Sequence, residues 1–393
     1  MVSVSAGSQT SINTDDLGVT GIRGGTVALA TANQLVINYA DGRSTDFRGN
    51  FTYDAAGQTL TGGTISSVTN STNGVPGLSV SQLNLPVATA LGWEAAGTDP
   101  AEIRAALLGG NDSLTGSDVN DTIRAYAGDD TINGGMGDDL LDGGSGVNII
   151  DGSDGIDTVA RSASLANSGA VKHNGEIYVI DAGGYDRMTN VEFIQYTDQT
   201  VASATAPVFD ALSYLAANPD LAAVYNTESD DAFDHYRSFG WSEGRALTFN
   251  AAGYLADNPD LATAFGTDTA EATRHYIEVG RNENRQADFD ATSYLAANPD
   301  LIQAFGSDPT AAALHYATYG RNEGRSLDFD ASAYLARYPD LQAAFGGDLQ
   351  AATAHYVAQG YEEGRSAAPL GTSTGTAFAS ADALQQQATL SIA

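Results

Sequence analysis

Acidic side chains recur at a fixed interval of nine residues between positions 107 and 160. This segment divides without insertion into six nonapeptides, whose sixth position is Asp112, Asp121, Asp130, Asp139, Asn148 and Asp157. The eighth position is always a large aliphatic residue, in order Leu114, Ile123, Ile132, Leu141, Ile150 and Val159. Because carboxylates and the carbonyl groups of glycine-rich turns supply only oxygen ligands, this pattern indicates binding of a hard divalent cation.

The aliphatic residues predict the element that positions these carboxylates. Glycine-rich turns let backbones approach closely, and the short segment around the eighth position can pair as a strand with the copy two nonapeptides further along. One coil of the resulting roll contains two turns and two strands, with the aliphatic side chains stacked inside. The sixth-position residues then form two columns, one with Asp112, Asp130 and Asn148 and the other with Asp121, Asp139 and Asp157.

Neighbouring carboxylates of one column would lie about 5 Å apart, which is one strand spacing. Two unscreened charges at this distance repel by roughly 1 kcal/mol in water and by several-fold more at a protein surface. Ca²⁺ accepts six to eight oxygen ligands with loose geometry and would remove this repulsion. If each ion bridges copies n and n+2, the six copies hold up to four ions. The alternative is a degenerate roll that packs without metal.

We therefore expect calcium sites built from three positions of the repeat. Besides the sixth position, the expected metal-binding residues are the fourth-position glycines and the fifth-position polar residues, namely Gly110, Gly128, Gly137, Gly146, Gly155, Asn111, Asn120, Asp129 and Asp138. Val119 replaces the glycine of the second copy and Asn148 lacks a full charge. The sites that these two residues touch should be weaker.

The repeats follow the template G-G-x-G-x-D-x-U-x, where U is a large aliphatic residue, and resemble the RTX (repeats-in-toxin, hemolysin-type) calcium-binding modules. The resemblance implies a parallel β-roll that binds Ca²⁺ in a secreted protein of a Gram-negative bacterium. It also implies export by a type I secretion machinery that reads an uncleaved C-terminal segment. Residues 369–393, whose only charged side chain is Asp382, resemble such a signal, although a frayed terminus would have the same composition.

The flanking segments predict a multidomain β plus α protein. Residues 1–97 form the expected N-terminal β domain, with strands at 34–39, 46–53, 59–68 and 78–85. Residues 98–201 form the expected roll, which begins with a helix over 100–108 that has Asp99 as its N-cap and covers the open end of the roll. Strands between 161 and 201 should close the other edge, and His173 is expected alone at the surface.

Residues 209–368 predict an all-α array of four 40-residue repeats, which begin at Phe209, Phe249, Phe289 and Phe329. Each copy should contain three short helices. We expect Asn218 to cap the second helix ahead of Pro219. Ala232, Tyr236 and Phe239 should form one apolar stripe on the third helix.

One histidine and one arginine recur in each helical copy. The histidines are His235, His275, His315 and His355, and each precedes a tyrosine. They could form a metal-binding or pH-sensing series, but without a second ligand one helical turn away a hydrogen-bonded structural role is favoured. The arginines Arg245, Arg285, Arg325 and Arg365 are expected to pair with the aspartates Asp220, Asp260, Asp300 and Asp340.

Composition limits the partners of the chain. The 393 residues contain 17 Lys and Arg against 49 Asp and Glu, a net charge of −32 that disfavours nucleic acid and anionic membranes. The sequence has no cysteine, no apolar run long enough to insert into a membrane, and no N-terminal stretch typical of a secretory signal peptide.

No catalytic residues and no organic cofactor are expected. The sequence lacks the H-E-x-x-H motif of zinc proteases and the G-x-S-x-G motif of lipases. We therefore expect a secreted Ca²⁺-binding structural protein, not an enzyme, that folds on Ca²⁺ and self-assembles as a homo-oligomer or polymer at the cell surface. The assembly would be a surface layer, filament or matrix, because the chain resembles bacterial surface-layer proteins and secreted RTX adhesins or extracellular filaments. The alternatives are an adhesin that binds surface polysaccharide and, third, a secreted hydrolase.

Overall fold

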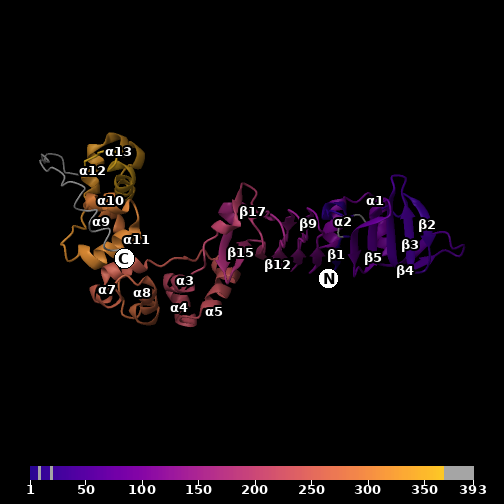
Figure 1. Ribbon diagram of the computed structural model, residues 1–393, viewed down its shortest axis with the longest axis horizontal. Coiled ribbons are helices and arrows are strands. Elements are labelled where there is room, and N and C mark those ends of the chain that lie inside the picture. The colour runs from indigo at the N-terminus through magenta and orange to yellow at the C-terminus, as the bar shows by residue number, and fades with distance from the viewer. Residues whose placement is uncertain (8–9, 18–20, 367–393) are drawn as a thin grey trace. The chain divides into compact units, whose positions relative to one another are not determined.

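The computed structural model describes residues 1–7, 10–17 and 21–366, and it confirms a β plus α protein (Figure 1). The chain divides into two compact units, which are described separately. The first unit contains residues 1–211 and 228–247, and the second contains residues 212–227 and the chain from 248 onward. The predicted tail 369–393 lies outside the described residues.

The first unit is built on two sheets. The 13-stranded sheet has the order β14-β15-β16-β12-β10-β8-β1-β6-β5-β4-β3-β2, with β7 paired to β5, and the 5-stranded sheet has the order β18-β17-β13-β11-β9. The N-terminal strands are β1 (Ser3–Ser5), β2 (Thr26–Ala30), β3 (Gln34–Asn38), β4 (Arg43–Tyr53), β5 (Leu60–Thr72), β6 (Val75–Ser81) and β7 (Leu85–Pro86). The short strands of the repeats are β8 (Ser113–Thr115), β9 (Thr122–Arg124), β10 (Thr131–Asn133), β11 (Leu140–Asp142), β12 (Gly146–Asp151) and β13 (Thr158–Ala160).

The N-terminal strands form where polar and apolar residues alternate, as predicted for 34–85. Leu35 and Ile37 of β3 and Phe47 and Phe51 of β4 are buried, while their neighbours in sequence face the other side of the sheet. A helix that the sequence analysis did not predict, α1 (Val87–Ala96), contacts β5. It ends at Gly97, whose left-handed conformation terminates the helix.

The nonapeptides form the parallel roll that was predicted from their spacing. Ile132 of β10 is paired with Leu114 of β8 and Ile150 of β12, so each strand pairs with the copy 18 residues away. Leu141 of β11 is likewise paired with Ile123 and Val159 in the other sheet. The six eighth-position side chains are each at most 1% exposed, and they form the interior of the roll.

The N-terminal edge of the roll is closed by the first residues of the chain. The backbone of this edge is paired by β1, which pairs with β8 and continues one sheet into the N-terminal strands. Helix α2 (Pro100–Leu107) buries Ile103 and Leu107 in the same core as Leu114 of the first repeat. Asn13, beside the short helix η1 (Thr14–Asp16), forms a bridge with Thr122 at the edge of the other sheet. The predicted segments 1–97 and 98–201 therefore share one continuous sheet. Asp99 does cap α2, where its carboxylate accepts a hydrogen bond from the Ala101 amide.

The other edge is closed by the strands predicted between 161 and 201. They are β14 (Gly169–His173), β15 (Glu176–Asp181), β16 (Gly184–Thr189), β17 (Phe193–Gln195) and β18 (Thr200–Ala202), with short helices η2 (Leu165–Asn167) and η3 (Ser203–Thr205). β16 and β17 extend the two parallel stacks by one rung, and antiparallel strands follow. The expectation for His173 is wrong, because its ring stacks on Phe233 with centroids 3.9 Å apart.

Each 40-residue copy folds into three helices followed by a π-helical turn. The first copy contains α3 (Ala211–Ala217), α4 (Pro219–Tyr225), α5 (Ser229–His235) and η4 (Tyr236–Gly240), of which α5 and η4 lie in the first unit. The other copies contain α6 (Ala251–Asp257), α7 (Pro259–Phe265), α8 (Thr269–His275), η5 (Tyr276–Gly280), α9 (Ala291–Ala297), α10 (Pro299–Phe305), α11 (Pro309–His315), η6 (Tyr316–Gly320), α12 (Ala331–Arg337), α13 (Pro339–Phe345), α14 (Leu349–His355) and η7 (Tyr356–Gly360).

Two details of the helical copies differ from the sequence prediction. Asn218 precedes α4 but does not cap it, because its amide nitrogen donates to the Tyr214 carbonyl oxygen of the preceding helix. Phe239 is 60% exposed and leaves the predicted apolar stripe, whereas Ala232 and Tyr236 are buried. The π-helical turn from Tyr236 onward has more residues per turn than an α-helix, which shifts the following side chains around the axis.

The recurring histidines and arginines of the second unit are tied into the helical packing. Nδ1 of His275, His315 and His355 lies 2.9, 2.8 and 3.0 Å from the hydroxyl group of Tyr254, Tyr294 and Tyr334, respectively. These tyrosines lie on the first helix of each copy and are not the sequence neighbours of the histidines. In the second unit the predicted arginine pairs form as Arg285 with Asp260, Arg325 with Asp300 and Arg365 with Asp340. In these copies the histidine has a structural hydrogen bond, as the sequence analysis favoured.

Candidate metal centre

The sixth-position side chains of the roll are buried and use one oxygen to connect successive coils. Oδ1 of Asp130 accepts a hydrogen bond of 2.8 Å from the Asp112 amide, and Oδ1 of Asp139 accepts one of 2.8 Å from the Asp121 amide. Asn148 and Asp157 accept in the same way from the amides of Asp130 and Asp139. Each column therefore continues from copy n to copy n+2, as the nonapeptide spacing predicted.

In four of the five sixth-position aspartates the second carboxylate oxygen is buried without a donor, whereas Oδ2 of Asp121 accepts a hydrogen bond of 2.5 Å from the Ser117 amide. Among the described residues, Oδ2 of Asp112, Asp130, Asp139 and Asp157 has no hydrogen-bond partner. A buried carboxylate oxygen that lacks a donor costs free energy unless a cation or a proton compensates it. The second oxygen is therefore the atom that a metal ion in the roll would contact.

The glycines at the first position of the nonapeptide keep a space open beside this oxygen. A Cβ atom on Gly134 would lie 2.4 Å from Oδ2 of Asp139, and one on Gly152 would lie 2.5 Å from Oδ2 of Asp157. Any side chain at these positions would occupy the space next to the carboxylate. Only the fourth-position glycines were predicted to belong to the site, and this first-position contact was not predicted.

The fourth-position glycines shape the turns that face the carboxylates. Gly128, Gly137, Gly146 and Gly155 have positive φ angles between 104° and 154°, which favour glycine. A Cβ atom on Gly146 would lie 2.1 Å from the carbonyl oxygen of Gly128 in the coil below. Gly110 in the first copy has no positive φ angle and no atom near its Cβ position. Four of the five predicted glycines are thus required for the stacking of the turns.

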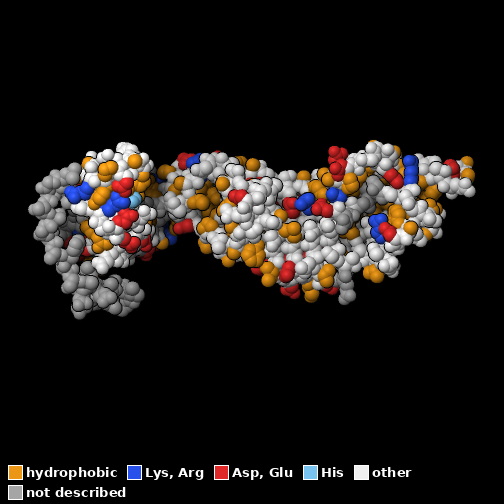
Figure 2. Space-filling view, turned by 90° about the horizontal axis from the view of Figure 1, so that it is seen from above, with side chains coloured by type: hydrophobic (Ala, Val, Ile, Leu, Met, Phe, Trp, Pro, Cys, Tyr) orange, Lys and Arg blue, Asp and Glu red, His pale blue; other side chains and the backbone are white. Residues whose placement is uncertain are grey.

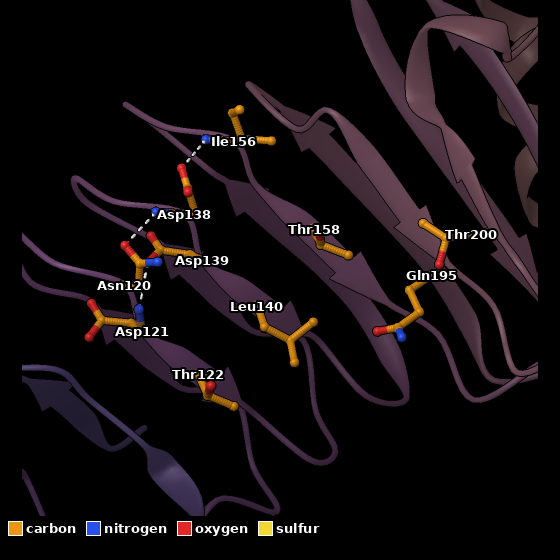
Figure 3. A pocket seen from close by; sticks show the side chains of 10 residues that line it. All are labelled: Asn120, Asp121, Thr122, Asp138, Asp139, Leu140, Ile156, Thr158, Gln195 and Thr200. Atoms are coloured by element: carbon orange, nitrogen blue, oxygen red, sulfur yellow. Dashed lines mark hydrogen bonds between the residues drawn. The ribbon is translucent and has the colours of Figure 1, made fainter.

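The fifth-position residues form a second set of connections at the exposed edge of the turns. Oδ1 of Asn120 accepts from the Asp138 amide at 3.0 Å, and Oδ1 of Asp138 accepts from the Ile156 amide at 3.0 Å. Asn111 and Asp129 accept in the same way in the other column. Figure 3 shows this outer series beside the sixth-position residues Asp121 and Asp139. The fifth position therefore joins adjacent coils, a role that the sequence analysis did not predict.

Burial raises the proton affinity of four sixth-position carboxylates, those of Asp112, Asp130, Asp139 and Asp157. It raises the pKa of Asp130 and of Asp139 from the ordinary value of 3.8 to about 7, and the neighbouring carboxylates of the same column act in the same direction. Burial also raises the pKa of Asp112 and Asp157. These shifts express the cost of holding closely spaced negative charges inside the roll without a cation.

Three residues that the sequence analysis did not assign to the site complete the columns. The Glu192 carboxylate accepts a hydrogen bond from the Asp157 amide and so occupies the next place in one column. Asp186 occupies the next place in the other column, after Asn148, whose side-chain nitrogen Nδ2 donates a hydrogen bond of 2.8 Å to it. Arg161 is 3% exposed and contacts both Asp186 and Asp181. Asp186 and Glu192 lie in the segment 161–201, which was predicted to close this edge of the roll, whereas no local pattern marks Arg161.

The donor set fits a hard divalent cation such as Ca²⁺. Carboxylate oxygens without a hydrogen-bond donor, which are the ligands that Ca²⁺ prefers, lie in both columns of the roll, at Asp112 and Asp130 in one and at Asp139 and Asp157 in the other. Within the described ranges, no three His, Cys, Asp or Glu side chains converge as a metal-binding cluster. The ligand set expected from the sequence differs from such a cluster because it combines carboxylates with backbone carbonyl oxygens. Bound Ca²⁺ would supply positive charge between successive coils.

Comparison with known proteins identifies the repeats. The family model described as RTX calcium-binding nonapeptide repeat, four copies, matches residues 108–141 and 137–159. No curated protein matches the chain. Among solved structures, the crystal structure of an extracellular lipase from Serratia marcescens is similar, with 28% sequence identity and a TM-score of 0.21. This match covers 21% of the chain and 14% of the lipase, so the chain spans only a small part of that protein's length.

Proposed function

This chain carries RTX calcium-binding nonapeptide repeats, which bind Ca²⁺, and from this premise we propose that it is a secreted structural protein. In this proposal the protein folds on Ca²⁺ outside the cell and assembles with itself as a surface layer, filament or matrix. The type I machinery exports it, and it catalyses no reaction. Within the described ranges, every helix is too short or too polar to span a lipid bilayer.

The observation that carries the proposal is the pair of carboxylate columns. Their unpaired Oδ2 atoms and raised pKa values make the metal-free roll unfavourable at neutral pH. Extracellular calcium modules have dissociation constants of roughly 10⁻⁴ to 10⁻³ M, which cytosolic calcium does not reach. The roll would therefore stay unfolded before export and fold afterward, when metal binding free energy becomes folding free energy.

Self-assembly is supported by the repeat architecture and by apolar side chains on the outer surface of the roll. Leu140 and Phe193 are each 37% exposed on the outer face of the 5-stranded sheet, separated by Thr158. A shallow hollow of about 390 Å³ lies on this face and is lined by Leu140 and Thr158 among others (Figure 3). Ca²⁺ would reduce the negative charge that keeps copies apart, since the chain carries a net charge of −32.

A second candidate function, an adhesin that binds a polysaccharide, is favoured by a different hollow in the first unit. It has a volume of about 390 Å³ and lies where β12 and β14 to β16 face α5. The hollow is lined by an aromatic side chain, Tyr185, and by hydrogen-bonding side chains that include Asn174, Arg187, Asp230 and Arg237. Such a mixture suits the hydroxyl groups and apolar faces of a sugar. A secreted hydrolase is the third candidate.

Electron microscopy of the full chain tests the first candidate against the second. We expect ordered assemblies in millimolar Ca²⁺ that disappear after chelation. A protein that stays monomeric in Ca²⁺ and binds immobilised polysaccharide would contradict self-assembly and support the adhesin. The variant Arg237→Ala, in the hollow, should lose polysaccharide binding only in the second case, and it should assemble normally in the first.

A further inference from the structure

The strand β2 is an open edge of the 13-stranded sheet. It is the last strand in the sheet order and pairs only with β3 among the described residues. All five residues from Thr26 to Ala30 are exposed, and Figure 1 shows β2 at the outer border of the N-terminal strands. One side of this strand therefore presents backbone N–H and C=O groups that have no strand partner in the described structure.

The opposite edge of the same sheet is covered. There the Lys172 amide of β14 donates to the Pro207 carbonyl oxygen, and the Phe209 amide donates to the Lys172 carbonyl oxygen. Lys172 and Val208 form a parallel bridge. The chain thus protects one edge of its largest sheet with its own backbone and leaves the other edge open.

β2 has few of the features by which proteins prevent pairing of exposed edges. Its sequence, TVALA, contains no lysine, no other charged residue and no proline. A register shift between Val27 and Leu29 places Val27 beside Ile37 and Leu29 beside Val36. Because neighbouring residues of β3 point to opposite faces, the edge has an apolar side chain on each face. Val27 and Leu29 are 55% and 42% exposed.

The charge around β2 favours a second copy of the chain as its partner. Residues 23–57, which form β2, β3 and β4, contain three arginines and three aspartates and are neutral within a chain of net charge −32. Arg43 pairs with Asp41, and Arg48 pairs with Asp46. Figure 2 shows blue and red atoms side by side over these strands. Two copies that meet at this edge avoid the repulsion that the rest of the acidic surface would cause.

We propose that β2 pairs in antiparallel orientation with β2 of a second copy, and so joins the two 13-stranded sheets around a twofold axis. Identical edges related by a twofold axis run antiparallel and are self-complementary. The pairing satisfies the open backbone groups and covers Val27 and Leu29. This inference rests on the proposed self-assembly and names one of its contacts.

The first test places charges on the edge of the full chain in millimolar Ca²⁺. The double variant Val27→Lys and Leu29→Lys should weaken dimerisation in sedimentation at least about tenfold, because like charges would face each other across the new strand pair. The control Val75→Lys changes a side chain of similar exposure, 57%, on β6, and it should dimerise as the unchanged protein does.

The outcomes separate this inference from the proposed function. If the unchanged protein assembles and the double variant assembles equally well, the β2 contact is wrong and self-assembly stands. Dimers that persist in chelator but are lost in the double variant would support β2 pairing and contradict calcium-dependent assembly. A protein that stays monomeric in Ca²⁺ at every concentration would overturn both.

Single cysteines give a second readout, since the chain has none of its own. Residues opposite one another in an antiparallel pair have Cα atoms about 4.5–5.5 Å apart, within the range of a disulfide. Mild oxidation of variants with one cysteine at each position from Thr26 to Ala30 should give covalent dimers at one or two positions. The control Val75→Cys should give none. Equal cross-linking at all five positions and in the control would contradict a defined strand pair.

Discussion

At the scale of single residues, the sixth-position aspartates perform two tasks with two oxygen atoms. Oδ1 of Asp139 accepts a hydrogen bond from the coil below, while its Oδ2 is buried without a donor. An asparagine can perform the first task, as Asn148 does for the Asp130 amide. Only a carboxylate brings the negative charge that binds Ca²⁺ strongly. This separation allows the metal site to be weakened without loss of the stacking contact.

We predict that Asp139→Asn lowers the affinity of the full chain for Ca²⁺ by on the order of tenfold to 100-fold. The side-chain oxygen of asparagine still accepts from the Asp121 amide, so the roll should fold when Ca²⁺ is raised. Calorimetric titration measures the change. Asp41→Asn, which removes the same charge from an exposed turn outside the roll, is the control. Equal affinities of the two variants would show that Asp139 is not a ligand.

The raised pKa values predict that the metal-free roll is more stable at acidic pH than at neutral pH. Burial raises the pKa of Asp130 and Asp139 to about 7, so the folded state holds protons that the unfolded state has lost above pH 4. The stability that these protons provide is complete below about pH 4 and is lost as the pH rises through about 7. Thermal melting in chelator should therefore show a more stable roll at pH 5 than at pH 8.

Calcium reverses this order, because the deprotonated carboxylates bind the ion. In millimolar Ca²⁺ the roll should be more stable at pH 8 than at pH 5, and its affinity for Ca²⁺ should fall as the pH is lowered from 8 to 6. Melting curves with the same pH order in chelator and in Ca²⁺ would contradict the assignment of these carboxylates to the site.

At the scale of elements, the fourth-position glycine allows the backbone conformation of the nonapeptide turn and its close contact with the next coil. Gly146 has a φ angle of +117°, and a Cβ atom there would lie 2.1 Å from the Gly128 carbonyl oxygen. We predict that Gly146→Ala destabilises the roll by at least about 1–3 kcal/mol from the backbone conformation alone, with a further cost from the clash. Gly110→Ala is the matched control at the same repeat position, where nothing lies near the added Cβ atom. Denaturant unfolding in Ca²⁺ should separate the two variants, and equal stabilities would contradict this account of the turn.

The same elements show which parts of the fold the sequence could predict. The spacing of Leu114, Ile132 and Ile150 was sufficient to predict the pairing of copies n and n+2, because a period of nine leaves one consistent register. β1 was not predictable, since Ser3–Ser5 is too short to carry a pattern and its partner β8 lies about 110 residues away. Arg161 was not predicted either, because no repeat marks its position and its contacts with Asp181 and Asp186 are made only in the folded state.

At the scale of the whole molecule, calcium connects the fold to the proposed assembly. The roll continues the N-terminal sheet through β1 and the closing strands through β16 and β17, so its folding orders strands on both sides. The β2 edge belongs to the same continuous sheet. A chain that folds only on Ca²⁺ would therefore present its pairing edge only after the metal has bound.

The most direct test of the central claim is circular dichroism of the full chain during a calcium titration, with sedimentation at each step. We expect the strand signal to be low in EDTA at pH 8, to rise cooperatively in the millimolar range, and to precede or accompany the increase in mass. The helical signal of the second unit serves as an internal reference. A strand signal that is complete in EDTA at pH 8 and unchanged by Ca²⁺ would contradict the account.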